Sequence, residues 1–382
     1  MPSPQRRLSV DDGAVQQLVD GLTARRGVHH ALLAIASGAD GAPRVYVSGR
    51  VRPGGPLMMP DTPFFVASVT KLFIAAAVFQ LVERDQVRLS EPISAYLPAT
   101  LVTGLHRLDG VDHGDRVTVE HLLRHASGLP DWLEDRPKGG KALIDGLFEG
   151  NDRSLTIEDV VATVRDGLTP HFAPQDLGGG RGRVRYSDTN YQLLMAIVES
   201  VTGQPLHQVY ADRLFGPLGL AHTWLPGHPP LAPTAAPADV FAGERAIEAP
   251  LALASVRDLY STGSDLVTFL RSLASGAAFA DPATARAMQD GWRRFGFPSS
   301  PAALRQPNWP IEYAMGTMRF RLPWFLDPRR RVPPVVGHTG STGTWAFHCP
   351  ELDLFLAGTV DQATAGPLPF SFVPRLLRTL RP

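Results

Sequence analysis

The longest apolar stretch of the chain covers residues 64–83 and is apolar on nearly every side. A helix that is apolar all round lies in the interior of a protein, so the pattern predicts a buried central helix over residues 64–83. A second helix, amphipathic, is predicted over residues 10–25, because apolar residues from Val15 to Leu22 recur at helical spacing. The first pattern predicts an interior element, and the second predicts a helix with one solvent-facing side.

Strand patterns occur near both ends of the chain, and helical patterns fill most of the middle. Residues 96–249 alternate short helices with loops rich in proline and glycine. This order predicts an α/β (α+β) domain built from both termini, residues 1–95 and 250–382, with residues 96–249 inserted as a mostly helical domain. The predicted strands are Ala31–Ala36, Arg44–Ser48, Tyr313–Phe320, Thr344–Phe347 and Asp353–Val360, and the further predicted helices are Ser264–Ala274 and Arg375–Leu380.

Charge and apolar content restrict the classes of partner. The 382 residues carry 37 basic and 37 acidic side chains, a formal net charge of zero. Duplex-binding domains carry a basic excess, so nucleic acid is not expected as the main partner. No run of about 18 apolar residues occurs, so neither a membrane span nor a membrane partner is predicted. With Cys349 as the only cysteine and no secretory signal pattern in residues 1–10, we expect a soluble, cytoplasmic protein without an internal disulfide.

Lysine is rare in this chain, and one of its three lysines lies where a charge is costly. Lys71 is in the middle of the apolar stretch, where a buried ammonium must be paired or deprotonated. Ser68 stands three residues earlier, so on a helix the two side chains share one face. A desolvated lysine is a suitable base for a serine nucleophile, and backbone N–H groups at a helix start can stabilise an oxyanion. A lysine that extends from the helix to solvent is the alternative.

Three short motifs resemble those of the serine penicillin-recognising enzymes. They are Ser68-Val-Thr-Lys71, Tyr186-Ser-Asp188 and His338-Thr-Gly340. Their order and spacing are most similar to class C β-lactamases, to D-alanyl-D-alanine carboxypeptidases with His-Thr-Gly, and to family VIII esterases. The resemblance extends over roughly residues 60–360 and implies an antiparallel sheet flanked by helices, together with a helical domain. Further similar segments are Val117–Asp131, Tyr191–Glu199 and Phe215–Leu220.

The resemblance implies a role for each residue of the first two motifs. Ser68 would be the acylated nucleophile, and Lys71 its hydrogen-bonded base or proton relay. Tyr186 would move protons between Ser68, the leaving group and later the deacylating water. A phenol loses its proton more easily beside a positive charge, which Lys71 would supply.

The third motif would form the opposite side of the site. His338 stands where many relatives have Lys, and with Thr339 and Gly340 it is expected to line a strand edge beside the nucleophile. The backbone N–H groups of Ser68 and Ser341 would form the oxyanion hole. Trp345 is expected to wall the acyl pocket, with burial in the core as the alternative.

Asp188 departs from the pattern of the resemblance. Many relatives carry Asn at this position, whose amide can donate to a substrate carbonyl, whereas an ionised carboxylate only accepts. This weakens the case for β-lactam or D-alanyl peptide substrates. A carboxylate near Lys71 would also favour the charged ammonium, raise its pKa and shift the base role toward Tyr186.

Two other patterns have simpler interpretations. His121 and His125 have the spacing of a zinc pair, but Leu122 stands where a metalloprotease has Glu and no third ligand is evident. No metal and no organic cofactor are therefore predicted. The run Arg329–Arg331 lies between proline-rich turns and is interpreted as a solvated loop, with contact to an acidic substrate group as the alternative.

These observations predict a serine hydrolase that forms an acyl-enzyme on Ser68. Carboxylic-ester hydrolysis of the family VIII type is the first choice, with a small-molecule ester or amide as substrate. The alternatives within the same chemistry are a DD-carboxypeptidase, a D-amino-acid amidase or a weak class C-like β-lactamase. A non-hydrolytic acyltransferase or binding protein on the same scaffold is a more distant alternative.

Overall fold

An eight-stranded sheet forms the centre of the computed structural model, which describes residues 11–38, 41–178, 182–297 and 307–380. The strand order is β2-β1-β14-β13-β12-β11-β10-β9, and every neighbouring pair is antiparallel. The two strands from the N-terminal part join the C-terminal strands through β1 and β14, as expected for a sheet built from both ends. The strands are β1 (His30–Ser37), β2 (Arg44–Gly49), β9 (Arg293–Arg294), β10 (Glu312–Tyr313), β11 (Met318–Phe320), β12 (Val335–Gly340), β13 (Thr344–Cys349) and β14 (Leu354–Thr359).

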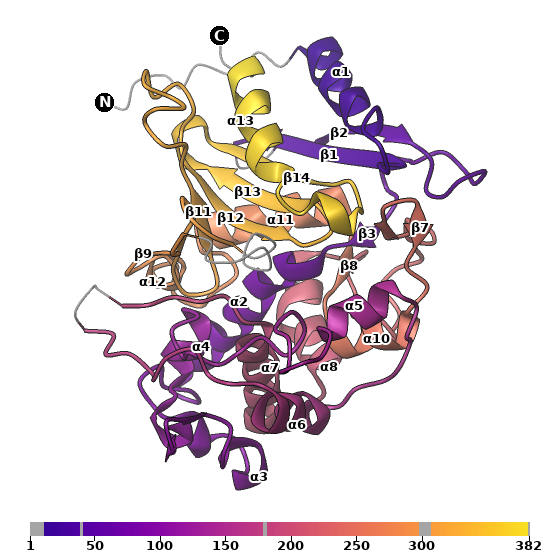
Figure 1. Ribbon diagram of the computed structural model, residues 1–382. Helices are drawn as coiled ribbons and strands as arrows, with labels where there is room; N and C mark the ends of the chain where they lie inside the picture. The colour runs from indigo at the N-terminus through magenta and orange to yellow at the C-terminus, as the bar shows by residue number, and fades with distance from the viewer. Residues whose placement is uncertain (1–10, 39–40, 179–181, 298–306, 381–382) are drawn as a thin grey trace, which may run out of the picture.

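Helices cover both faces of this sheet (Figure 1). Helices α1 (Asp12–Thr23) and α13 (Pro369–Thr379) lie on one face, and α2 (Thr70–Val82) and α11 (Gly263–Ser275) lie on the other. Strand β1 accordingly alternates its side chains between two apolar clusters, with Leu33 packed on the α1 side and Leu32 on the α2 side. The predicted fold class is therefore confirmed.

The central helix α2 is buried almost throughout, but it begins later than the apolar pattern predicted. Phe64–Phe65 form the short strand β3, and Ala67–Val69 form a 3₁₀ turn before α2 begins at Thr70. The reason is Ala67, whose φ of 47° lies in the left-handed region that an α-helix cannot include. The residues of this turn are apolar like those of the helix, so the apolar pattern did not show where the helix begins.

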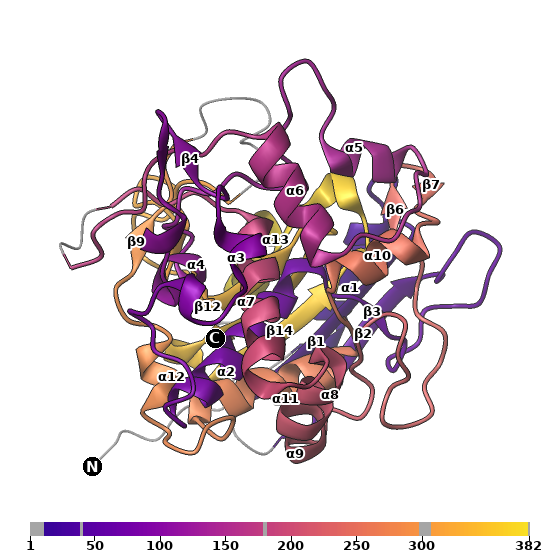
Figure 2. The same cartoon turned by 90° about the horizontal axis from the view of Figure 1, so that it is seen from below.

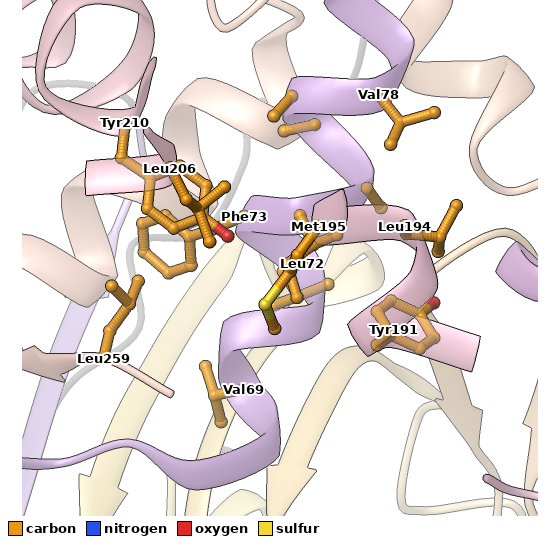
Figure 3. Close-up of a cluster of buried hydrophobic side chains, with 14 of the residues drawn as sticks. Val69, Leu72, Phe73, Val78, Tyr191, Leu194, Met195, Leu206, Tyr210 and Leu259 are labelled. Carbon is orange, nitrogen blue, oxygen red and sulfur yellow. The ribbon is translucent and has the colours of Figure 1, made fainter. Parts of the chain in front are cut away.

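The buried side of α2 packs against the helical region. Phe73 stacks on Phe269 of α11 with ring centroids 3.6 Å apart. Figure 3 shows Leu72 and Phe73 of α2 facing Met195 of α7 (Asp188–Thr202) and Tyr210 of α8 (Leu206–Tyr210). One apolar cluster thus joins the sheet, α2 and the inserted helices.

Most of residues 99–256 form α7, several shorter helices and the loops that connect them, and they lie in front of the sheet when the molecule is seen from below (Figure 2). The division into two domains at residues 95 and 250 stays a prediction. The remaining helices are α3 (Ala99–Val102), α4 (Val119–Leu123), α5 (Leu143–Phe148), α6 (Ile157–Gly167), α9 (Gly216–Leu218), α10 (Pro250–Val256) and α12 (Thr284–Ala287). The short strand pairs are β3 (Phe64–Phe65) with β8 (Tyr260–Ser261), β4 (Arg107–Leu108) with β5 (Val111–Asp112), and β6 (Phe241–Ala242) with β7 (Arg245–Ala246).

Two other sequence predictions need correction. The single strand predicted over Tyr313–Phe320 is two strands, β10 and β11, joined by a turn in which Gly316 adopts a φ of 81°. The C-terminal helix begins at Pro369 rather than Arg375, since proline suits the first turn of a helix.

Other expectations meet the structure only in part. No helix among the described residues is long and apolar enough to cross a bilayer, and Cys349 is buried and forms no disulfide. Residues 1–10, on which the prediction of a cytoplasmic location partly rested, lie outside the described residues.

Candidate active site

Ser68 lies in the 3₁₀ turn directly before α2, and Lys71 lies in the first turn of the helix. The Lys71 Nζ donates a hydrogen bond to Ser68 Oγ over 3.1 Å. Both residues are buried, with Lys71 2% exposed and Ser68 9% exposed at the edge of a cavity. The structure therefore brings the two residues of the first motif into contact, as their spacing predicted.

The left-handed backbone at Ala67 makes the turn that presents Ser68 to the cavity. A non-glycine residue in this region costs on the order of 1–3 kcal/mol and persists only where its surroundings hold it. Here β12 packs directly on the turn, because a Cβ added at Gly340 would lie 2.8 Å from both the Ala67 Cβ and the Val66 carbonyl oxygen. Only glycine at 340 allows the strand to approach the nucleophile this closely.

Lys71 also donates to Asp188, the first residue of α7. Burial alone would lower the pKa of Lys71, but the negative charge of Asp188, with a contribution from Asp258, outweighs burial and raises that pKa well above its usual value. The ammonium is therefore charged in the resting site. The expected direction of this pKa is confirmed.

Tyr186 precedes α7 and packs beside the ammonium, with Lys71 Nζ 5.1 Å from the centroid of its ring. Burial raises the pKa of Tyr186 well above 10, although Lys71 acts in the opposite direction. The expectation that Lys71 would make this phenol easy to ionise is therefore not met. Lys71 and Tyr186 both hold their protons in the resting site.

His338 on β12 is fully buried behind the cavity rather than in its wall. Its Nδ1 lies 2.7 Å from the Thr339 carbonyl oxygen, so this nitrogen carries the proton and donates. Its Nε2 then accepts from the Tyr313 hydroxyl at 3.1 Å. Burial, assisted by the charge of Lys71, lowers the pKa of His338 to about 3, so the ring is neutral. A charge at this position, which a Lys would supply, is absent.

The residues that follow His338 do reach the cavity, but Trp345 does not. Thr339, Gly340 and Ser341 line it beside Ser68. Trp345 is fully buried, and its indole lies 5.1 Å from the Phe372 ring of α13. The expectation that Trp345 walls the pocket is corrected: the side chain shares a sheet face with its cross-strand partner Thr339, but it is enclosed in the apolar cluster beneath α13. The oxyanion hole from the N–H groups of Ser68 and Ser341 stays a prediction.

The cavity has a volume of about 290 Å³ and lies between the sheet and the inserted helices. One side presents Ser68 and the β12 residues, and the other presents apolar side chains of α5 and α10. Three acidic side chains line it as well, and no lysine or arginine does so among the described residues. The apolar lining residues include Phe65, Ile144, Leu147, Phe148, Val240, Ile247, Leu253 and Val256, and the acidic ones are Glu134, Asp188 and Asp258.

Residues 15–368, nearly the whole chain, match the beta-lactamase family model. The chain belongs to the beta-lactamase family. The three motifs that carried the resemblance thus lie in a protein whose family is established by its full length.

Individual relatives of this beta-lactamase family protein are distant. Esterase EstB of Burkholderia gladioli is 34% identical over 175 residues, which are 44% of this chain and 40% of the esterase. The putative penicillin-binding protein PbpX of Bacillus subtilis is 29% identical over 163 residues, 43% of this chain and 33% of that protein. The chain thus spans less than half the length of these curated relatives.

Solved structures match over the whole fold. The D-amino acid amidase of Ochrobactrum anthropi SV3, complexed with D-phenylalanine, superposes with a TM-score of 0.73 at 25% identity and covers 97% of both chains. The hydrolase EstCE1 superposes with a TM-score of 0.70 at 20% identity, over 96% of this chain and 98% of its own. The second likeness concerns the fold alone.

Asp258 is a site residue that the sequence analysis missed. It lies two residues before β8, whose pairing with β3 brings it next to the nucleophile turn. Burial raises its pKa to about 7, and the charge of Asp188 acts in the same direction while Lys71 opposes it. No motif marks this position, so only the pairing of two distant segments reveals it.

Asp131 holds the start of α7 in place. Its carboxylate accepts from the backbone N–H of Asp188 at 3.1 Å and from those of Leu133 and Glu134. Burial and the charge of Asp188 raise the pKa of Asp131 well above its usual value. Asp131 therefore adds a further carboxylate beside Asp188, the partner of Lys71.

The two histidines with zinc-like spacing are used separately. His121 closes the capping box of α4, and its Nε2 lies 2.6 Å from the Gln175 carbonyl oxygen. His125 Nδ1 accepts from the Ser187 backbone N–H at 3.2 Å. In the described ranges no group of three or more His, Cys, Asp or Glu side chains is arranged to hold a metal ion.

Proposed function

We propose that this protein is a serine hydrolase that cleaves carboxylic esters through an acyl-enzyme on Ser68. The observation that carries the proposal is the 3.1 Å hydrogen bond between Lys71 Nζ and Ser68 Oγ at the wall of a largely apolar cavity. A nucleophile hydrogen-bonded to a proton-transferring side chain is the arrangement that covalent catalysis requires. Membership of the beta-lactamase family supports it.

The protonation states of the site favour a proton relay. Ser68 Oγ attacks the acyl carbon, and its proton passes to Lys71 while Lys71 gives one to Tyr186 and Tyr186 gives one to the departing alkoxide. The ester C–O bond breaks, an alcohol leaves, and the relay is again fully protonated. Water then attacks the acyl-enzyme by the reverse path and releases the acid. Because each member gives a proton as it receives one, neither Lys71 nor Tyr186 needs to be ionised beforehand.

The charges of the cavity favour neutral substrates over anionic ones. β-Lactams and D-alanyl peptides carry a carboxylate, which needs a cationic partner. The described lining contains acidic side chains but no lysine or arginine, and the neutral His338 does not reach the cavity. Asp188 accepts from Lys71 and, when ionised, offers no proton to a substrate carbonyl. These features support an ester without a carboxylate next to the scissile bond.

A D-amino-acid amidase is the second candidate. The substrate of such an enzyme, a D-amino-acid amide, has a free amino group that would pair with an acidic side chain of the cavity. The amidase of Ochrobactrum anthropi SV3 also shares the fold over 97% of the chain. A DD-carboxypeptidase or a β-lactamase fits the charges less well. An acyltransferase would use the same acyl-enzyme but pass the acyl group to an alcohol instead of water.

One substrate panel tests these candidates. Wild type and Ser68→Ala are assayed with p-nitrophenyl esters, D-phenylalanine amide, a D-Ala-D-Ala peptide and a chromogenic cephalosporin, and both are treated with a fluorophosphonate. We expect ester turnover and labelling in wild type only. Labelling that survives Ser68→Ala would refute the mechanism, and amide turnover above ester turnover would select the amidase. Ester consumption that yields a new ester when alcohol is added would select the acyltransferase.

Asp188→Asn tests the discrimination against lactams. The variant restores an amide donor and removes a negative charge from the cavity, so we expect detectable acylation by the cephalosporin and a lower kcat for esters, about tenfold. Intact-mass spectrometry detects the acyl adduct on Ser68. A variant that gains no acylation and loses no esterase activity would count against the role assigned to Asp188.

A further inference from the structure

Exposed aromatic side chains gather on one rim of the cavity. Phe297 and Trp324 are each 75% exposed, more than any other large hydrophobic residue that the structure describes, and Phe325 and Leu326 are 56% and 58% exposed. Trp309 joins them, since its ring lies 5.1 Å from Phe297 and 6.2 Å from Phe325 in stacked arrangements. We call these five residues the aromatic rim. An exposed apolar group of this kind marks an interaction site more often than chance.

The loop between β11 and β12 carries three of the rim residues, Trp324, Phe325 and Leu326, and is held by hydrogen bonds of its own. The buried carboxylate of Asp327 accepts from the backbone N–H groups of Arg331 at 3.0 Å and Val332 at 2.8 Å. The Leu326 N–H donates to the Pro323 carbonyl at 2.9 Å. The exposure of Trp324 and Phe325 is thus a consequence of an ordered turn.

Four arginines flank the rim on the same loop. Arg321, Arg329, Arg330 and Arg331 are all exposed, and none forms an ion pair with another described residue. The acidic residue of the loop, Asp327, is buried and turned to the backbone. We call these four residues the arginine cluster. Its charge is concentrated in a chain whose formal net charge is zero.

We propose that the aromatic rim and the arginine cluster dock the protein on the surface of a bilayer that contains anionic phospholipid. Aromatic side chains settle at the level of the lipid headgroups, and arginines beside them pair with lipid phosphates. Such a contact lies on the surface and needs no membrane-spanning segment, so it differs from the expectation of no membrane partner, which rested on the lack of an apolar span. The proposal does not depend on which substrate the enzyme hydrolyses.

The position of Trp309 connects this surface to the cavity. Trp309 lines the cavity and also stacks between Phe297 and Phe325 of the rim. A protein docked through the rim therefore has its cavity open beside the lipid. Apolar esters dissolved in the bilayer would reach Ser68 along aromatic side chains.

A second copy of the chain is a less suitable occupant. A twofold interface through the rim would bring two arginine clusters toward each other, and like charges close together repel. A lipid surface with negative headgroups has the opposite charge. This complementarity is the reason to choose lipid over self-association.

The test is binding to vesicles of phosphatidylcholine with and without phosphatidylglycerol, measured by co-sedimentation at low and high salt. We expect wild type to bind vesicles with phosphatidylglycerol and to lose binding as salt rises. Arg329→Gln/Arg330→Gln/Arg331→Gln should weaken binding roughly 100-fold, at about fivefold per arginine. Trp324→Ser/Phe325→Ser should abolish it. Both variants should hydrolyse a soluble ester at the wild-type rate, because none of the substituted residues lines the cavity and Trp309, which does, is left unchanged.

Matched variants control for general changes in charge and hydrophobicity. Arg375→Gln/Arg378→Gln removes exposed arginines from α13, and Leu57→Ser/Leu231→Ser removes exposed apolar side chains elsewhere. Equal losses in the controls, or no binding by wild type at low salt, would overturn the proposal. So would a dimer in analytical ultracentrifugation that Trp324→Ser/Phe325→Ser dissociates, since the rim would then be covered by a second copy.

Discussion

Two pairs, each of a basic side chain and a carboxylate, lie in different parts of this molecule and have different surroundings. His30 on β1 and Asp361 after β14 are both completely buried, with His30 Nε2 and Asp361 Oδ2 2.9 Å apart. Every polar atom of this first pair has a partner, since His30 Nδ1 lies 3.1 Å from the Arg50 carbonyl and Asp361 Oδ1 accepts from Thr359 at 3.0 Å. The pair fastens the ends of two neighbouring strands.

The pair formed by Lys71 and Asp188 differs in the number of carboxylates that surround its single cation. It borders the cavity, and two further carboxylates, Asp131 and Asp258, share its surroundings with raised pKa values. The two pairs differ in burial as well, since both members of the first are completely buried whereas the Asp188 side chain is 18% exposed. What distinguishes the second pair is an excess of carboxylates over cations beside a nucleophile, an arrangement that stores protons and marks candidate functional sites.

The largest expected effect comes from removing the lysine of the second pair. Lys71→Met should lower kcat/KM for a p-nitrophenyl ester by about 10³-fold, because the relay from Ser68 is interrupted. Steady-state kinetics measures it, with Lys138→Met, at an exposed lysine, as the control. Activity within tenfold of wild type would show that Lys71 is not in the proton path.

The same operation on the first pair should affect folding instead. Asp361→Ala leaves His30 buried without its partner, so we expect the free energy of unfolding to fall by about 3 kcal/mol. kcat/KM should change less than about twofold at temperatures where the variant is folded. Urea denaturation of Asp361→Ala, His30→Ala and the double variant measures the coupling between the two residues. A loss of activity in a folded variant would contradict the assignment of the His30–Asp361 pair to stability alone.

Asp258 should link stability and activity through pH. Its folded pKa of about 7 exceeds the usual 3.8 of an aspartate, so the folded state holds a proton that the unfolded state releases as pH rises above 3.8. Stability contributed by this group is thus complete below about pH 4 and declines as pH rises toward 7. Asp258→Asn should therefore raise the free energy of unfolding at pH 7 by roughly 2–4 kcal/mol.

The activity of the wild type should report the same ionisation. An ionised Asp258 adds negative charge near the developing oxyanion, so kcat/KM should fall about three- to tenfold as pH rises through about 7. Asp258→Asn should lack this step. A pH profile of the variant that coincides with that of wild type would assign the ionisation to another group.

The smallest effect is expected at a partly exposed pair. The pKa of Asp135 is about 2, because burial, which raises it, is outweighed by His171 and Arg185. A lowered pKa contributes stability above about pH 4 that is lost as pH falls toward 2. Asp135→Asn should lower the free energy of unfolding by about 1 kcal/mol at pH 7. The difference from wild type should disappear in denaturation experiments near pH 2, and a constant difference would contradict the assignment.

Local sequence patterns predicted most of the helices and strands. The errors arose where the backbone conformation of one residue, or packing against a distant part of the chain, determined the structure. The apolar stretch predicted α2, and the spacing of Ser68 and Lys71 predicted their contact. The helix start was misplaced because alanine rarely adopts the conformation of Ala67. Trp345 was misplaced because a side chain that shares a sheet face with a cavity residue need not reach the cavity, and here α13 packs against the indole.

The acidic surroundings of Lys71 were only half predictable. Asp188 belongs to a motif, and its effect on the pKa of Lys71 followed from charge alone. Asp258 and Asp131 belong to none of the three motifs, and they reach the site through the β3–β8 pairing and the start of α7. The pKa of each group in such a site depends on its burial and on all the charges around it. The prediction that Tyr186 ionises easily considered only the charge of Lys71 and was therefore wrong.

Because the single cysteine of the chain is buried, a cysteine introduced at the surface can be labelled selectively. Cys349 lies wholly inside the folded protein, so thiol reagents in native buffer have no accessible target. Trp324→Cys would create one at the rim, and a polarity-sensitive dye attached there would report the arrival of lipid by fluorescence. The same label on the Leu231→Cys variant would provide the reference signal, without removing any native residue to silence the background.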